Sequence, residues 1–271
     1  MLLIILSVII AIFLYGFLIE PEFLMRTDLA FEFRELAKPI KIIQVSDLHA
    51  TRISRPFRKT VEVIKQEKPD FVFITGDFVG YRKVLSCTDF LSKITEVCPR
   101  TFAVLGNWDH KVNNLNGLIQ EIEATGIKLL TNESVLAKGI YIAGVDDPYR
   151  NMDNLAEAFR KIPTGSFVIL LAHSPDIVYR ALPYRPKLIL AGHLHGGQVS
   201  IPFLKFALYS PSKYWIKFLR GLYGFKETYM YVNRGIGESH LRLRICSPPE
   251  IAVIKLQPLS NTEEQNLTSS V

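Results

Sequence analysis

Five short apolar runs, each ending in a residue that can bind a metal ion, constrain the fold of this chain more than any other feature. Such β-rich runs are typical of buried strands. They are IKIIQVSD, ending at Asp47; FVFITGD, at Asp77; TFAVLGN, at Asn107; FVILLAH, at His173; and KLILAGHLH, at His193 and His195. Because α/β sheets bind ligands beyond the carboxyl ends of their strands, we expect these side chains to converge.

Helical patterns separate several of these runs. One apolar face is formed by Phe57, Val61 and Ile64, and a second by Leu115, Leu118, Ile119 and Ile122. DNLAEAFRKI and PDIVYRAL are further helix candidates, and YMYVNRG and EIAVIKL are later strands. The alternation predicts an α/β fold with helices layered on sheet.

The spacing of the polar residues strengthens the prediction of a metal site. Asp47 with His49, and His193 with His195, are two residues apart, so both side chains of a pair can face the same way. Glycines flanking the runs allow sharp turns. Each motif alone has an ordinary alternative, namely a cap, a turn or a satisfied core histidine. Four of the six histidines in the chain belong to this set, which favours metal binding.

The N-terminus predicts a membrane anchor. Residues 1–19 carry no charged side chain and would form a helix about 28 Å long, which can cross a bilayer core. A cleaved signal peptide would need a basic start and a small-residue cleavage site, and a buried core helix is the other alternative. The basic residues that follow, Arg26, Arg34, Lys38 and Lys41, predict a single-pass protein of the inner (cytoplasmic) membrane with its domain on the cytoplasmic side.

The expected organisation is an anchor at 1–20, a linker at 21–40, a globular domain at 41–257 and a disordered polar tail at 258–271. Three scattered cysteines form no C-x-x-C pair, so neither a disulfide framework nor a thiolate zinc site is indicated. The net charge of +6 favours anionic partners.

The ordered motifs resemble the calcineurin-like metallophosphoesterase superfamily. Its series D-x-H, G-D, G-N-H-[DE], H and G-H-x-H is similar to Asp47-Leu48-His49, Gly76-Asp77, Gly106-Asn107-Trp108-Asp109, His173 and Gly192-His193-Leu194-His195. The stretches GGQVSIPF, NRGIGES and SPPEIAVI resemble its membrane-linked bacterial branch, which includes UDP-2,3-diacylglucosamine pyrophosphatases.

The resemblance implies a four-layer α/β/β/α sandwich with two divalent metal ions. Asp47, His49, Asp77 and His195 would hold one ion, and Asp77, Asn107, His173 and His193 the other, with Asp77 bridging. Oxygen and imidazole ligands suit Mn²⁺, with Zn²⁺ or Fe as alternatives. The implied reaction is attack of an activated water on phosphorus.

One position departs from the family pattern. The histidine that follows the asparagine in the family, credited with transition-state stabilisation or leaving-group protonation, is replaced by Trp108. His110 could substitute for it, or could be a surface-loop histidine. Without an acid an alkoxide leaves poorly, because the pKa of water itself is about 15.7. A phosphate monoester leaves easily, because its second pKa is about 6. We therefore expect a pyrophosphate or a similarly good leaving group.

The stretch from Ile201 to Lys226 interleaves aromatic and basic residues and contains no acid. This composition predicts a substrate-binding or membrane-binding patch that includes Lys205, Tyr214, Trp215, Lys217 and Arg220. The alternative is a loop packed on the core with its lysines in solvent. Nucleic-acid binding would use the same residue types, but the anchor argues against it.

These features together predict a two-metal hydrolase of a phosphoanhydride or phosphodiester bond in an amphiphilic, membrane-associated substrate. Asn107 and His110 are the candidate catalytic residues, and UDP-2,3-diacylglucosamine, from lipid A synthesis, is the leading substrate. The alternatives are a broad-specificity phosphodiesterase and a catalytically weak, lipid-binding scaffold.

Overall fold

Two six-stranded sheets form the centre of the protein, in a computed structural model that describes residues 1–50, 53–81, 87–201, 206–207, 212–213, 215–238 and 241–259. The first sheet has the strand order β1-β14-β2-β3-β4-β5, and the second has the order β12-β13-β9-β8-β7-β6. A two-stranded ribbon, β10 (Ser200–Ile201) and β11 (Phe206–Ala207), lies outside both sheets.

The first sheet is mostly parallel. Its strands are β1 (Met25–Phe33), β14 (Glu250–Pro258), β2 (Ile40–Val45), β3 (Phe71–Thr75), β4 (Thr101–Val104) and β5 (Lys128–Leu129). Only the pair between β14 and β2 is antiparallel. The carboxyl ends of β2, β3 and β4 therefore meet at one edge of the sheet.

The second sheet contains four parallel strands between two antiparallel edge strands. The strands are β12 (Gly221–Phe225), β13 (Thr228–Val232), β9 (Leu188–Ala191), β8 (Val168–Leu171), β7 (Ile140–Gly144) and β6 (Glu133–Ala137). Strands β8 and β9 precede the predicted histidine ligands, so these ligands also start from carboxyl ends.

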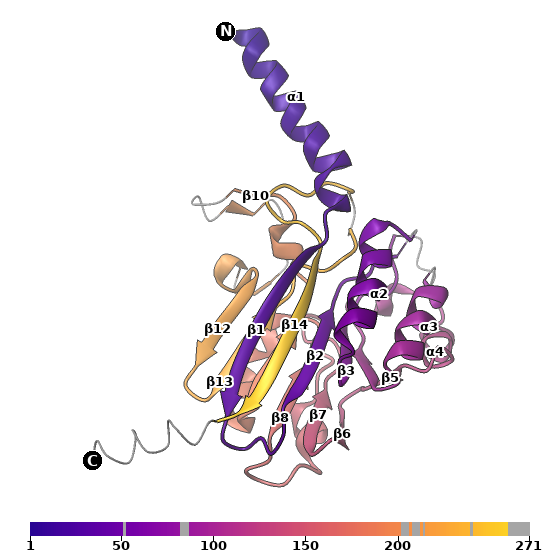
Figure 1. Cartoon of the computed structure of the whole chain (residues 1–271), viewed down its shortest axis with the longest axis vertical. Coiled ribbons are helices and arrows are strands. Elements are labelled where there is room, and N and C mark those ends of the chain that lie inside the picture. The colour runs from indigo at the N-terminus through magenta and orange to yellow at the C-terminus, as the bar shows by residue number, and fades with distance from the viewer. Residues whose placement is uncertain are drawn as a thin grey trace, which may run out of the picture.

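Successive side chains along each strand point to opposite faces of the sheet, and this alternation produces the layers. In β2, Ile43 and Val45 pack with the helices on the outer face, whereas Ile42 packs against the second sheet. The outer helices of the first sheet are α2 (Arg55–Glu67), α3 (Thr88–Val97) and α4 (Leu115–Glu123) (Figure 1). The second sheet carries α5 (Leu155–Phe159) and α6 (Val178–Ala181) on its outer face. Three apolar layers thus separate four structural layers, which confirms the predicted α/β/β/α class.

The predicted helical faces are buried where the periodicity placed them. In α2 the buried side includes Phe57, Val61 and Ile64, and the helix ends at Lys68 in a left-handed conformation. In α4 the Asn114 side chain caps the helix by accepting from the Gly117 N–H. PDIVYRAL differs from the expectation of one helix: it is divided into η3 (Pro175–Ile177), α6 and η4 (Leu182–Tyr184).

The predicted linker at 21–40 is wrong, because the interval contains the edge strand β1. All nine residues of β1 pair in parallel with β14, near the other end of the chain. The partner lies more than 200 residues away, so the local pattern of MRTDLAFEF did not reveal the pairing. Most of the predicted tail at 258–271 lies outside the described residues.

The N-terminal helix α1 (Leu2–Leu18) extends away from the sandwich (Figure 1). Residues Leu2–Glu22 are long and apolar enough to cross a membrane, with a mean hydropathy of 3.1 over an 18-residue stretch. These properties suit either an anchor or a signal segment.

The end of α1 is built into the domain. The Gly16 carbonyl accepts from the Arg244 N–H at 3.0 Å. A Cβ on Gly16 would lie 2.8 Å from side-chain atoms of Leu243 and Ile245, so glycine permits this close approach. The buried Glu20 carboxylate accepts from the backbone N–H groups of Cys246 and Ser247. The segment 243–247 is thus held against the helix end.

We predict that Glu20→Ala destabilises the domain, because it leaves backbone donors at this junction without their acceptor. The expected loss is about 1–3 kcal/mol in the free energy of unfolding. Urea unfolding in neutral detergent, followed by circular dichroism, measures it. Glu32→Ala, at an exposed position of β1, is the matched control and should change stability by less than about 0.5 kcal/mol. Equal losses in the two variants would contradict the role of Glu20.

Candidate metal centre

Seven predicted ligands meet where the carboxyl ends of the two sheets face each other. Asp47, His49, Asp77 and Asn107 follow strands of the first sheet, and His173, His193 and His195 follow strands of the second. All seven are buried, although charged and polar side chains are rarely buried without partners.

Two groups of potential metal ligands are present among the described residues. The first contains Asp47, His49 and His195, and the second contains Asp77, His173 and His193; within each group the ligand atoms lie within 4.8 Å of one another. In the first group the His49 and His195 Nε2 atoms are 3.1 Å apart. In the second, His193 Nδ1 lies 3.1 Å from His173 Nε2.

Asp77 lies between the two groups. Its Oδ2 atom is 3.2 Å from His49 Nε2 and 3.3 Å from His173 Nε2. Its Oδ1 atom accepts from the Trp108 N–H at 2.8 Å, which fixes the carboxylate. Asn107 joins the second group, with Oδ1 3.1 Å from His173 Nε2.

Backbone carbonyls orient two of the imidazoles. His49 Nδ1 lies 3.1 Å from the Val79 carbonyl, and His173 Nδ1 lies 2.8 Å from the Thr75 carbonyl. A carbonyl oxygen can only accept, so Nδ1 carries the proton in both rings and Nε2 is left to present its lone pair toward Asp77.

The charges of the centre reflect this close packing. Burial alone would raise the pKa of Asp77, but His173 and His49, when protonated in place of binding a cation, hold that pKa well below its ordinary value. Burial, together with the neighbouring His49, holds the pKa of His195 well below its ordinary value. His195 is therefore a neutral imidazole, the form that binds a metal.

This donor set fits divalent cations. Two ligands that bind one ion at about 2.1 Å and at right angles are about 3 Å apart, close to the separations between the Nε2, Nδ1 and Oδ atoms of both groups. With Nδ1 protonated in His49 and His173, the Nε2 lone pairs of both rings face the Asp77 Oδ2 atom at 3.2 and 3.3 Å, so that acceptor faces acceptor. A cation between the lone pairs removes this conflict.

The turns that carry the ligands are strained. Asp47, His49, Asp77, His193 and His195 all have φ between 38° and 76°, in the left-handed region that non-glycine residues seldom adopt. Backbone hydrogen bonds hold two of these residues in place. The Asp47 N–H donates to the Gly76 carbonyl at 3.1 Å, and the His49 N–H donates to the Asp77 carbonyl at 2.9 Å. These five residues are all candidate ligands, and backbone strain at a functional site is often maintained by the function.

At two glycines of the predicted motifs, neighbouring atoms approach so closely that a side chain would not fit. A Cβ on Gly192 would lie 1.8 Å from Ser46 Oγ, and one on Gly106 would lie 2.2 Å from Asp77 Oδ1. Neither position has a positive φ, so these glycines serve contact between strand ends rather than a special turn.

Asp109 supports the centre and had no predicted role. Its buried carboxylate accepts from the N–H groups of Gly106, Asp77 and Val79 at 2.8–3.1 Å. Burial and the Asp77 charge raise the pKa of Asp109 to about 7. In the sequence, the only indication of this role was the position of Asp109 two residues after the predicted ligand Asn107.

Trp108 and His110 occupy different places around the ligands. The Trp108 ring packs edge-on to His49, with centroids 5.6 Å apart, and Lys111 Nζ lies 3.7 Å from the Trp108 ring centroid. His110 is not a surface-loop residue, because its side chain is only 4% exposed and Nε2 lies 2.6 Å from Asp146 Oδ1. The Asp146 hydrogen bond raises the pKa of His110.

Of the residues named for the predicted aromatic and basic patch, only Lys217 and Arg220 have described side chains, and these two lie in different surroundings. Lys205 and Tyr214 lie outside the described residues, and of Trp215 only the backbone is described, in η6 (Trp215–Phe218). Phe218 is buried in the core of the second sheet. Lys217 is exposed, with Nζ 5.1 Å from the Tyr179 ring centroid. Arg220 is half-buried and donates to the carbonyls of Cys246 at 2.6 Å and Gly196 at 3.5 Å, which places it beside the loop that carries His195.

Comparison with known proteins agrees with this geometry. The family model described as Calcineurin-like phosphoesterase matches residues 40–197. An uncharacterized metallophosphoesterase of Aquifex aeolicus is 33% identical, over 90% of this chain and 95% of its own length. Phosphodiesterase YaeI of Escherichia coli is 32% identical, over 86% and 87%. The UDP-2,3-diacylglucosamine pyrophosphatase LpxG of Chlamydia trachomatis is 28% identical, over 80% and 83%.

Proposed function

The chain belongs to the calcineurin-like phosphoesterase family of metal-dependent hydrolases, and we propose that it cleaves a phosphoanhydride or phosphodiester bond in a membrane-associated amphiphile. The best candidate is UDP-2,3-diacylglucosamine. The observation that carries the proposal is the position of Asp77 Oδ2, within 3.3 Å of one imidazole from each ligand group.

We assign two cation sites to the seven ligands. One is formed by Asp47, His49, Asp77 and His195, and the other by Asp77, Asn107, His173 and His193. Oxygen and nitrogen ligands without thiolate suit Mn²⁺, with Zn²⁺ or Fe as alternatives. Divalent cations held there would neutralise charge on a phosphoryl group and lower the pKa of a water molecule.

His110 is the candidate proton donor. Its hydrogen bond with Asp146 favours the imidazolium form, which can protonate a departing oxygen. Burial raises the pKa of Asp147, one residue further, although nearby His173 and His110 act to lower it; this supports a place for His110 at the rim of the centre. Asn107 contributes an amide to the same region.

Trp108 favours a substrate with a good leaving group. Its indole contacts the ligand His49 and holds no proton that is transferable near neutral pH. A pyrophosphate releases a phosphate monoester, whose second pKa is about 6, so its departure needs little assistance. The relationship to LpxG supports the same substrate class.

The helix α1 serves as an uncleaved anchor in this proposal, with the domain on the cytoplasmic side of the inner membrane. Gly16 and Glu20 contact the segment 243–247, contacts that cleavage of a signal would remove. The basic residues after α1 favour the cytoplasmic orientation.

A broad-specificity phosphodiesterase is the second candidate function, supported by the relationship to YaeI.

We predict that Asp77→Ala reduces Mn²⁺-dependent turnover by at least about a hundredfold. Removing a residue that only hydrogen-bonds to a metal ligand typically costs about 10–100-fold, and removing a ligand itself should cost more. Bound metal, measured by elemental analysis of the purified protein, should fall in parallel while circular dichroism stays unchanged. Asp89→Ala, at an exposed position of α3, is the control. Unchanged turnover in Asp77→Ala would refute the bridging role.

We predict a basic limb in the pH profile of kcat/KM that depends on His110. Asp146 raises the pKa of His110, so its imidazolium persists to higher pH, and activity falls as pH rises through the raised pKa. Asp146→Asn should shift this limb to lower pH, and His110→Gln should abolish it. If both variants retain the wild-type limb, His110 is not the proton donor.

We predict that acylated UDP-glucosamine is hydrolysed at least about tenfold faster, by kcat/KM, than its deacylated form or a simple alkyl phosphodiester. Product release in vesicles with Mn²⁺, with and without EDTA, measures this preference. Equal rates on all substrates would identify the broad-specificity enzyme instead. Failure to hydrolyse even an aryl phosphodiester would identify a scaffold.

A further inference from the structure

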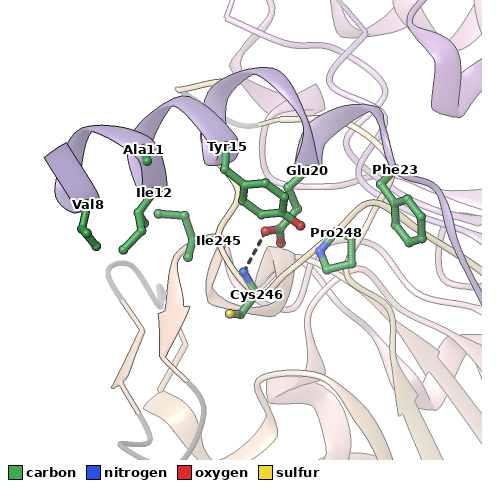
Figure 2. A pocket seen from close by; sticks show the side chains of 9 residues that line it. All are labelled: Val8, Ala11, Ile12, Tyr15, Glu20, Phe23, Ile245, Cys246 and Pro248. Atoms are coloured by element: carbon green, nitrogen blue, oxygen red, sulfur yellow. Dashed lines mark hydrogen bonds between the residues drawn. The ribbon is translucent and has the colours of Figure 1, made fainter.

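An apolar groove runs between α1 and the segment 245–248 (Figure 2). Its volume is about 660 Å³, within the range of about 300–1,000 Å³ typical of small-ligand sites. The apolar residues that define this α1 groove include Val8, Ile12, Tyr15, Phe23, Ile245 and Pro248.

One face of α1 supplies a wall of the groove without packing into the domain. Val8, Ile12 and Tyr15 recur at helical spacing and point toward Ile245 and Cys246 (Figure 2). They are 53%, 46% and 45% exposed. These side chains belong to the potential membrane span Leu2–Glu22, so an apolar ligand could reach them directly from the bilayer.

The other wall of the groove is directly connected to the metal centre. The Ser247 hydroxyl donates to the carbonyl of His195, a predicted ligand, at 2.7 Å. The neighbouring residues Cys246 and Pro248 line the groove. A ligand in the groove is therefore separated from the metal centre by a single stretch of backbone.

Positive charge lies between the groove and the centre. Arg220 donates to the Cys246 carbonyl on the groove side and to the Gly196 carbonyl on the side of the centre. Among the described residues Arg220 forms no ion pair with a carboxylate, whereas the adjacent Arg234 is paired with Glu250 at 3.0 Å. The Arg220 cation is thus available to an anionic head group, next to an apolar slot that suits its chain.

We propose that the α1 groove binds an acyl chain of the substrate while the phosphorylated head passes Arg220 to reach the metal centre. The inference deepens the proposed function and rests on it for the reaction. Binding of the chain itself requires only the groove, so the two can be tested separately.

The test uses the full chain in phosphatidylcholine vesicles and a dodecyl phosphate that carries a diazirine at the end of its chain. After photolysis, peptide mass spectrometry locates the adducts. We expect adducts at 245–248 and on the Val8–Ile12–Tyr15 face of α1. Excess dodecyl phosphate at ten times its Kd should reduce them about tenfold, and butyl phosphate should not compete.

Two matched variants test the location. Ile12→Trp fills the groove and should lower adduct yield at 245–248 at least about fivefold, because the indole takes the space of the chain. Ile10→Trp makes the same change at a similarly exposed position, 50% against 46%, that does not line the groove, and should retain wild-type labelling.

The outcomes separate the two proposals. Labelling that is uniform around α1, is not displaced by dodecyl phosphate, or is reduced equally by Ile10→Trp and Ile12→Trp would overturn the groove. Labelling needs no turnover, so an inactive protein with groove-specific adducts would overturn the proposed function alone. An active protein without such adducts would overturn the groove alone.

Discussion

The buried Asp77 carboxylate between two imidazole nitrogens is the contact on which the site depends. His49 and His173 donate their Nδ1 protons to backbone carbonyls, so their Nε2 lone pairs face the Asp77 carboxylate. Lone pairs and carboxylate oxygens packed at about 3 Å repel one another unless protons or cations lie between them. A pair of divalent cations would satisfy all these ligand atoms together, which agrees with the membership of the chain in the calcineurin-like phosphoesterase family.

The arrangement of the two sheets brings the imidazoles to Asp77. Parallel strands in both sheets direct their carboxyl ends to one edge, and the apolar layer between the sheets holds the edges together. Left-handed backbone at five ligand residues turns the side chains inward. Asp109 binds three backbone N–H groups of the loops after β3 and β4, so part of the ligand geometry is set by a residue that holds no metal in our assignment.

The apolar helix α1 is structurally connected to the metal centre. The end of α1 contacts the segment 243–247, which in turn contacts the carbonyl of His195 through Ser247. Through this segment the helix and the metal centre share one packed structure. An amphiphilic substrate fits that arrangement, because its chain and its phosphate would find apolar and cationic surfaces on either side of the same backbone.

The sequence alone determined the α/β class, the buried helical faces and the set of converging ligands. Each of these follows from local periodicity, or from the rule that parallel strands end at a common edge. Only the tertiary structure decided that β1 is an edge strand, that His110 bonds to Asp146, and that Phe218 is buried while Arg220 lies beside Gly196. These features depend on pairings between residues far apart in the chain, where side-chain type leaves several partners possible and packing selects one.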